Sequence, residues 1–455
     1  MKIFDKKDYL MHAGMLACGA LLGIAAFACS SPKAPSSTAA NPKGSETAAA
    51  TPEPAKPTEK PTEEPAAEPT EDPNVARIAE TGTGVTVVKA ADYETRFPLQ
   101  YTSYMMNNEN DEVVEYTETS PYIKTLYEGY GFAKSYGSAR GHTYVIADIS
   151  ATGRPHKLAN CYTCKTSSFT AEVLNKGDSA YAMAFDDFTD SITDDFGCFH
   201  CHGNDVASGK ITITHGYLTN AIGDDFANVK AATMSCGQCH TEYYFDPETK
   251  ATTLGYHGLA TMNPDDMLAY ENSIVDAEGN MFADWVDEDT GVRKLKVQHP
   301  EFETYLGEGS PHAKMNFTCA DCHMPEETSE DGTAYTSHYW ISPLDSQDLL
   351  DNNCSKCHKD LAAEVREIQE KTTAREDEIG NALAKFDADL AAAIAAEKIS
   401  GEDLESIRLL SRNAQWYWDF VYVENSEGVH NPTLTTYCLD KAQELLDEAY
   451  KLLGE

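Results

Sequence analysis

Ten cysteines of the chain stand in five Cys-x-x-Cys pairs, and each pair is followed at once by a residue that can ligate a metal. Histidine follows four of them, in CFHCH (198–202), CGQCH (236–240), CADCH (319–323) and CSKCH (354–358). This spacing is typical of c-type haem attachment, in which two thiols bond the haem and the adjacent histidine ligates the iron. The remaining pair, CYTCK (161–165), has lysine in that place.

The pattern predicts five covalently attached haems rather than zinc ribbons or a disulfide framework. Zinc needs paired units to reach four ligands, whereas here an odd number of units is spread over nearly 200 residues. A disulfide framework does not explain why His or Lys follows every pair. The predicted haem-bonding thiols are Cys161, Cys164, Cys198, Cys201, Cys236, Cys239, Cys319, Cys322, Cys354 and Cys357. The predicted proximal iron ligands are Lys165, His202, His240, His323 and His358.

The net charge of the chain limits the classes of partner that it can bind. The formal net charge of −39 disfavours nucleic acid and bare anionic membrane and favours solubility. An anionic substrate would therefore need a locally positive site. Hydrophobic residues make up 41% of the sequence, which is enough for a packed core.

The N-terminus predicts export and tethering. Basic residues precede an apolar stretch that ends at Cys29, so we interpret 1–29 as a signal peptide of the lipoprotein type, lipidated at Cys29. An uncleaved transmembrane anchor is the alternative, since about 20 apolar residues can span a bilayer. Residues 30–75 hold half of the 20 prolines and lack large apolar runs, which predicts a disordered Pro/Ala/Glu-rich tether.

We predict a mainly α fold for 76–455, a multihaem cytochrome c with a haem-packed core and long C-terminal helices. Residues 140–358 are rich in Gly, Asp, Asn and Thr, so we expect short helices and loops wrapped around haems. Residues 359–455 carry apolar residues at spacings of three and four. They predict helices over 361–397, with a possible break near 372–375, over 401–425 and over 434–454. Trp416, Trp418 and Cys438 are expected in the core.

Several segments resemble the pentahaem cytochrome c nitrite reductases. One C-x-x-C-K is followed by four C-x-x-C-H in the same order as in that family, together with RGHTY (140–144), CHTEYYFD (239–246), KVQHPEFE (296–303), RNAQWYWD (412–419) and GVHNP (428–432). The resemblance implies a periplasmic or cell-surface enzyme that reduces nitrite to ammonium with six electrons, as in dissimilatory nitrate reduction. It implies that Lys165, bound as a neutral amine, marks the catalytic haem, whose other face is open. The four bis-histidine haems would relay electrons.

The resemblance also implies the other site residues. Arg154, Tyr243 and His299 correspond to the catalytic pocket, with Arg140 as the alternative arginine. One calcium ion is expected on Glu242, Tyr243, Lys296 and Gln298, whose oxygen atoms suit a hard cation. The distal iron ligands would be His142, His312, His338 and His430, in an order that the sequence leaves open. Surface or supporting roles are left for His156, His200, His215 and His257.

The family further implies a membrane quinol dehydrogenase or multihaem cytochrome as electron donor, and a homodimer formed through the long helices. Two other functions stay open. One is a multihaem reductase acting mainly on hydroxylamine or a sulfur oxyanion. The other is a cytochrome that only transfers electrons, with the lysine-ligated haem capped by a sixth ligand.

Overall fold

The computed structural model describes residues 72–454 except 156 and 277. The predicted signal peptide with Cys29, and nearly all of the predicted tether, lie outside the described residues. Across the described part, no helix combines the length and apolarity that a bilayer span requires.

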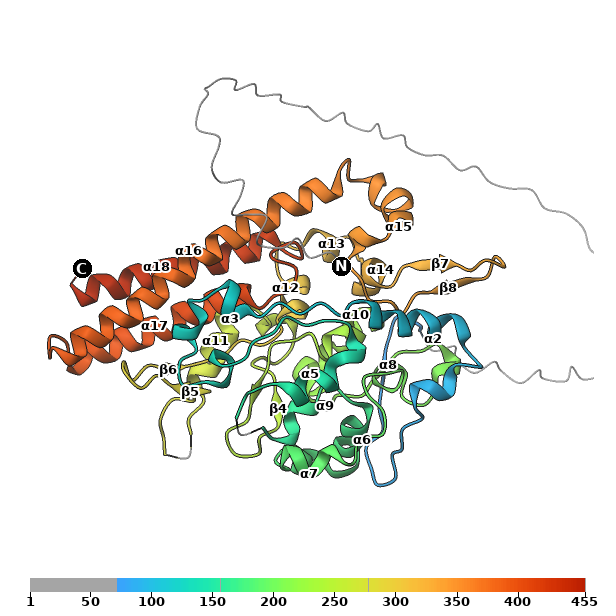
Figure 1. The fold of residues 1–455 in the computed structure, drawn as a ribbon, viewed down its shortest axis with the longest axis horizontal. Coiled ribbons are helices and arrows are strands. Elements are labelled where there is room, and N and C mark those ends of the chain that lie inside the picture. Colours follow the sequence, from blue (N-terminus) through green and yellow to red (C-terminus); the bar gives the residue numbers. More distant parts are fainter. Residues whose placement is uncertain (1–71, 156, 277, 455) are drawn as a thin grey trace, which may run out of the picture. The chain divides into compact units, whose positions relative to one another are not determined.

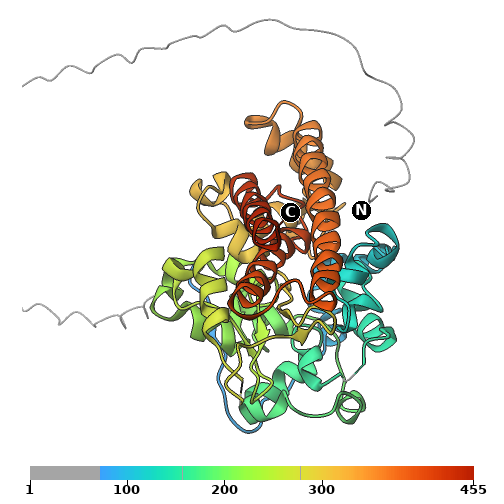
Figure 2. The same cartoon turned by 90° about the vertical axis from the view of Figure 1, so that its left-hand side faces the viewer.

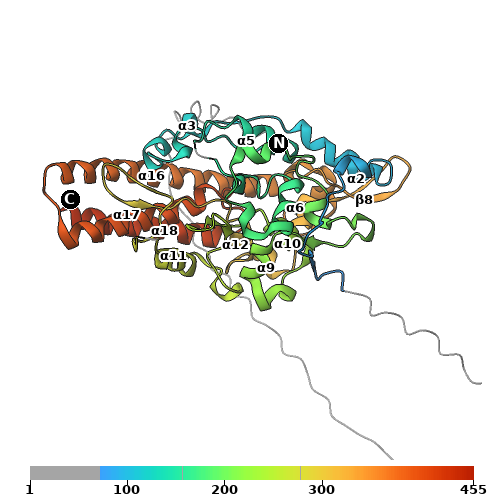
Figure 3. The same cartoon turned by 90° about the horizontal axis from the view of Figure 1, so that it is seen from below.

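Three long helices dominate the C-terminal part, as predicted: α16 (Leu361–Ala395), α17 (Gly401–Tyr422) and α18 (Pro432–Leu453). They run alongside one another in two perpendicular views (Figures 1 and 3), and Figure 2 shows them foreshortened, from the side on which the C-terminus lies. The 35 residues of α16 span roughly 50 Å at about 1.5 Å per residue. Asp360 caps its first turn, and Asn431 followed by Pro432 starts α18.

The predicted break in α16 near 372–375 is wrong. The apolar stripe lapses there, but buried polar residues continue the inward face of the helix. Thr372 packs beneath Gly428, and the Glu376 carbonyl accepts a hydrogen bond from Trp418 at 2.9 Å. The tertiary contacts therefore stabilise the helix over a stretch in which the hydrophobic pattern does not indicate one.

The main core lies between these helices and the shorter elements before them. Trp416, Trp418 and Cys438 are fully buried in it, as expected. A second, smaller cluster lies around the first cysteine pair, where Tyr162 stacks on Phe185 with ring centroids 4.2 Å apart. This cluster packs against the CYTCK segment, through Tyr162 and Cys161.

Residues 76–358 form short helices and loops, as predicted (Figure 1). The α-helices are α2 (Pro98–Met105), α3 (Tyr116–Thr119), α4 (Ile123–Leu126), α5 (Val145–Ala151), α6 (Ser167–Lys176), α7 (Phe185–Thr189), α8 (Phe199–His202), α9 (Gly216–Ile222), α10 (Ala231–Gly237), α11 (Pro264–Ser273), α12 (Glu301–Leu306), α13 (Pro311–Lys314), α14 (Cys319–His323) and α15 (Gln347–Asn352).

The strands form four separate two-stranded ladders. β1 (Arg77–Ile78) pairs in parallel with β2 (Thr212–Ile213). The other three pairs are antiparallel: β3 (Tyr244–Phe245) with β4 (Thr252–Thr253), β5 (Trp285–Val286) with β6 (Arg293–Lys294), and β7 (Glu326–Thr328) with β8 (Ala334–Thr336). Strand structure is too short to form a layer, so helices and loops position the cysteine pairs.

Candidate active site

The five cysteine pairs all occupy tight helical turns, which place both thiols of a pair on one side. The amide of the histidine that follows bonds back to the first cysteine carbonyl in three pairs: His202 to Cys198 at 3.0 Å, His240 to Cys236 at 2.9 Å and His358 to Cys354 at 2.9 Å. The Lys165 amide bonds instead to Tyr162 at 2.9 Å, one residue closer. The lysine motif therefore has a tighter, 3₁₀-type turn.

Neighbouring motifs lie in a definite order. Cys164 of the first motif and Cys239 of the third lie in one cluster, within 4.8 Å of each other. α10, which carries Cys236 of the third motif, packs against α14, which begins with Cys319 of the fourth. Burial raises the pKa of Cys201, and the neighbouring Cys236 adds to the rise; burial raises the pKa of Cys322 to about 11, and Cys354 adds to it. The first, third, fourth and fifth motifs therefore follow one another in space, with the second beside the third.

Four pairs of histidine rings face one another across spaces that fit a haem iron. Two metal–imidazole bonds of about 2.0–2.1 Å, plus the two ring radii, give roughly 6 Å between ring centres. Each predicted proximal histidine faces a different predicted distal one. The ring centroids are 6.0 Å apart for His142 and His240, 6.5 Å for His202 and His338, 6.2 Å for His323 and His430, and 6.0 Å for His312 and His358.

Five of the eight rings have an Nδ1 partner that leaves Nε2 for a metal. Three face a backbone carbonyl: His202 with Lys210 at 3.0 Å, His323 with Ile341 at 2.9 Å and His338 with Thr336 at 3.1 Å. Two face a carboxylate: His358 with Glu364 and His430 with Glu424, both at 2.6 Å. Such partners fix the tautomer and orientation of ligating histidines. All four pairs therefore fit bis-histidine haem sites in spacing, and five of the eight rings also have a partner that fixes the tautomer.

Arg154 and Tyr243 lie around the lysine motif. The Arg154 guanidinium stacks on Phe132 at 3.7 Å and donates to the Ser135 carbonyl at 3.2 Å. Burial lowers the pKa of Arg154, while Tyr136, Tyr130, Tyr243 and Cys161 oppose that shift. Burial raises the pKa of Tyr243 well above its usual value, and Cys164 and Cys161 add to the effect. Cys161 of the first pair is thus among the groups that affect the pKa of both side chains.

The alternative arginine, Arg140, is engaged elsewhere. It forms a two-pronged ion pair with Asp148, at 2.7–3.1 Å, and its guanidinium lies 3.9 Å from the centre of the Tyr144 ring. The geometry thus favours Arg154 as the pocket arginine.

His299 lies against the third motif, whose Cys239 adjoins the first. Its ring centroid is 6.2 Å from that of His240. Glu301 lies within ion-pair distance of both rings, 3.9 Å from His299 Nδ1 and 3.8 Å from His240 Nδ1. His299 therefore lies beside the third motif, whose Cys239 is close to Cys164 of the lysine motif.

The four predicted calcium ligands come together. The buried Glu242 carboxylate accepts a hydrogen bond from the Gln298 amide, and the Gln298 side chain donates to the Lys296 carbonyl at 3.1 Å. Burial raises the pKa of Glu242 well above its usual value, and the nearby Glu271 adds to this. A carboxylate, an amide and two carbonyls around a costly buried acid form a donor set that suits calcium.

The long helices hold this segment in place. Asp419 of α17 binds Lys296 Nζ at 3.0 and 3.1 Å, accepts from the Val297 amide at 3.0 Å and accepts from Tyr127 at 2.5 Å. The RNAQWYWD segment thus positions the residues that lead to His299.

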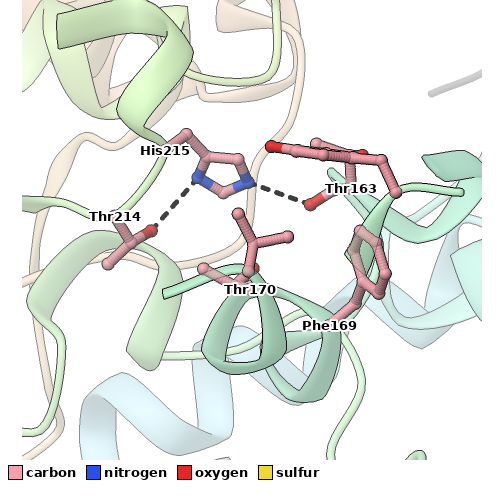
Figure 4. Close-up of a pocket in the computed structure, with 7 residues that line it drawn as sticks. Thr163, Phe169, Thr170, Thr214 and His215 are labelled. Atoms are coloured by element: carbon pink, nitrogen blue, oxygen red, sulfur yellow. Dashed lines mark hydrogen bonds between the residues drawn. The ribbon is translucent and has the colours of Figure 1, made fainter. Parts of the chain in front are cut away.

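His215 is a supporting residue that the sequence did not single out. Its Nε2 faces the Thr163 carbonyl at 2.9 Å, and its Nδ1 faces Gln238 Oε1 at 3.0 Å. It lines a small pocket with Thr163, Phe169, Thr170 and Thr214, where its two ring nitrogens point toward Thr163 and Thr214 (Figure 4). His215 therefore ties the first motif to the third, and it lies beside Cys164 and Cys239, two of the predicted haem-bonding thiols.

Sequence reasoning also missed Glu301 and Asp419, although both stand inside segments that carry the family resemblance. Their roles depend on contacts between distant parts of the chain. The remaining spare histidines differ: His200 is fully buried, His257 is exposed, and His156 lies outside the described residues.

The paired rings and clustered thiols define a multihaem c-type cytochrome. The cytochrome c552 family model matches residues 89–454, and the chain belongs to this family. It is 30% identical over 421 residues to the cytochrome c nitrite reductase subunit NrfA of Nitratidesulfovibrio vulgaris, covering 81% of this chain and 79% of that one. It is 28% identical over 387 residues to cytochrome c-552 of Aliarcobacter butzleri, covering 78% and 74%.

A solved relative has the same fold. The cytochrome c nitrite reductase of Desulfovibrio desulfuricans ATCC 27774, whose catalytic subunit is described with two calcium sites, superposes with a TM-score of 0.71 at 28% identity. The match covers 82% of this chain and 87% of that one. The predicted mainly α fold with long C-terminal helices is confirmed.

Proposed function

We propose that this chain is an ammonia-forming cytochrome c nitrite reductase with five haems. The proposal rests on the distribution of the candidate distal histidines among the five motifs. All four candidate distal histidines are paired with the four histidine motifs. Within the described residues this leaves the lysine motif without a distal histidine and next to Arg154 and Tyr243. The similarity to two nitrite reductases supports the same assignment.

When bound, the haem at Lys165 supplies an open iron position for nitrite, and the other four supply electron transfer. Arg154 stays charged despite its burial, because arginine is not deprotonated in proteins. It would balance the negative charge of nitrite in a strongly acidic chain. Tyr243 and His299 would donate hydrogen bonds and protons to the oxygens that leave as water.

We propose one calcium ion on Glu242, Tyr243, Lys296 and Gln298. The Gln298 side chain would turn its oxygen toward the ion, since its nitrogen now donates to Lys296. The ion would offset the burial of Glu242 and add positive charge beside the pocket.

Export, a lipid anchor at Cys29, a homodimer through α16–α18 and a membrane quinol dehydrogenase as donor complete the proposal. The anchor rests on the sequence alone. The dimer and the donor rest on the family resemblance.

The test is nitrite-dependent oxidation of reduced viologen by the haem-loaded protein, with ammonium quantified. We expect one ammonium per nitrite and six viologen radicals consumed. Nitric oxide as the product would refute the assignment. Faster steady-state turnover of hydroxylamine or sulfite than of nitrite would favour the alternative reductase. Absence of a high-spin haem signal and of any spectral response to nitrite would favour a cytochrome that only transfers electrons.

Replacing Lys165 with histidine should keep five haems but lower nitrite turnover. The other four motifs attach haem with histidine, so attachment should survive. Imidazole differs from a neutral amine in size and electron donation, and we expect a loss at least as large as the 10–100-fold seen when outer partners of metal ligands are changed. Full turnover would mean that the open distal face alone matters. Haem content by pyridine haemochrome and viologen kinetics measure the two effects.

A further inference from the structure

Glu301 stands between two histidines with different proposed tasks. Its Oε1 lies 3.9 Å from Nδ1 of His299 in the pocket. Its Oε2 lies 3.8 Å from Nδ1 of His240, the proximal residue of the third motif. The two rings are 6.2 Å apart and inclined at 67°. A single carboxylate therefore reaches the catalytic pocket and an electron-transfer site at once.

The position of this carboxylate is fixed from behind. Glu301 is the first residue of α12 and is buried. Its Oε1 accepts hydrogen bonds from the backbone and side-chain amides of Asn425, which follows α17. Residues from two distant segments thus hold the carboxylate in the space between the rings.

Two buried polar atoms at this place have no closer partner. Glu301 Oε2 and His299 Nδ1 are both buried without a hydrogen bond among the described residues. Unpaired buried polar atoms are costly and rare in folded proteins. Because the carboxylate lies within 4 Å of Nδ1 of each ring, small adjustments of both rings would satisfy both atoms: His299 would donate to Oε1 and His240 to Oε2.

We infer that Glu301 is a positioning residue that accepts the Nδ1–H of both His299 and His240, and so links the catalytic histidine to the third haem site; this rests on the proposed function. On His299 the bond fixes the ring and keeps one proton on Nδ1, which turns Nε2 toward nitrite. On His240 the bond increases electron donation to the iron and lowers the potential of the third haem. The carboxylate–histidine arrangement orients an imidazole in the same way as the acidic member of a catalytic triad.

Glu424 provides a matched comparison. It makes a carboxylate contact of the same kind to Nδ1 of His430, at 2.6 Å, and His430 faces His323 of the fourth motif. Within the part of the chain that the structure describes, Glu424 forms no hydrogen bond or ion pair with His299. Glu301→Gln and Glu424→Gln therefore remove the same charge from two haem sites, and only the first touches the pocket.

The experiment compares both variants with the wild type after five haems have been counted by pyridine haemochrome. We expect Glu301→Gln to raise the midpoint potential of the third haem, to weaken nitrite binding at the high-spin haem, and to lower kcat by about 10–100-fold. Glu424→Gln should raise the potential of the fourth haem only and leave the nitrite-binding spectrum unchanged.

An unchanged third-haem potential, or a kcat within twofold of wild type, in fully loaded Glu301→Gln would overturn the inference. If that variant loads fewer haems, Glu301→Asp keeps the charge but shortens the side chain. It should raise the same potential and lower kcat, and failure to do so would also overturn the inference. Failure of the proposed function would appear separately, as a wild-type protein that makes no ammonium.

Discussion

Replacing His299 with asparagine should lower nitrite turnover by about 10²–10⁴-fold, the usual contribution of a positioned proton donor. Asparagine can still donate a hydrogen bond, but it cannot deliver and recover protons. His299 belongs to none of the five cysteine motifs and to none of the four proposed ligand pairs, so all five haems should remain. Viologen-linked turnover and haem content measure the two expectations.

His257→Asn is the control for this variant. His257 is exposed, and its ring contacts Tyr270 on the surface at a centroid distance of 5.6 Å. The control should keep wild-type turnover. If His299→Asn also kept turnover within tenfold of wild type, proton delivery would have to be assigned to another group, with Tyr243 the first candidate.

Replacing Asp419 with alanine should destabilise the protein by about 3–5 kcal/mol, the usual cost of leaving one partner of a buried ion pair uncompensated. Asp419 is fully buried and compensates the charge of Lys296, which is only 2% exposed. It also accepts hydrogen bonds from Val297 and Tyr127, which would lose their partner. Since Lys296 supplies a proposed calcium ligand, calcium affinity should fall as well.

Guanidinium unfolding followed by circular dichroism, with the haem-loaded proteins compared side by side, measures this effect. Asp205→Ala is the control, because Asp205 pairs with Arg77 at 2.8 Å on the surface, where both side chains are at least 36% exposed. An exposed pair contributes at most about 1 kcal/mol. A loss of similar size in the two variants would show that Asp419 is not an anchor of the catalytic segment.

Local patterns in the sequence account for much of the fold. The apolar spacing predicts α16, α17 and α18 because helix periodicity is a property of neighbouring residues. The predicted interruption near 372–375 fails because Thr372 and Glu376 are buried through contacts with residues about 40–60 positions away. A hydrophobic pattern does not contain those partners.

The same distinction between local and distant contacts decides which parts of the candidate site could be predicted. The cysteine motifs are short, so the thiols and proximal residues can be read directly from the sequence. Which distal histidine faces which motif depends on distant parts of the chain, as for His142 and His240 or His312 and His358. The carboxylates that contact these rings are still harder to predict, because nothing in the sequence distinguishes a glutamate such as Glu301 from any other acidic residue.

The partners of the ligand histidines also differ in how freely they can change over evolution. Both rings of the second site, His202 and His338, point to main-chain carbonyls. A carbonyl survives any mutation of the residue that carries it, so this site keeps its surroundings through sequence drift. Glu364 and Glu424 can each be lost by a single codon change. Selection can therefore retune the fourth and fifth sites individually while the second stays constant.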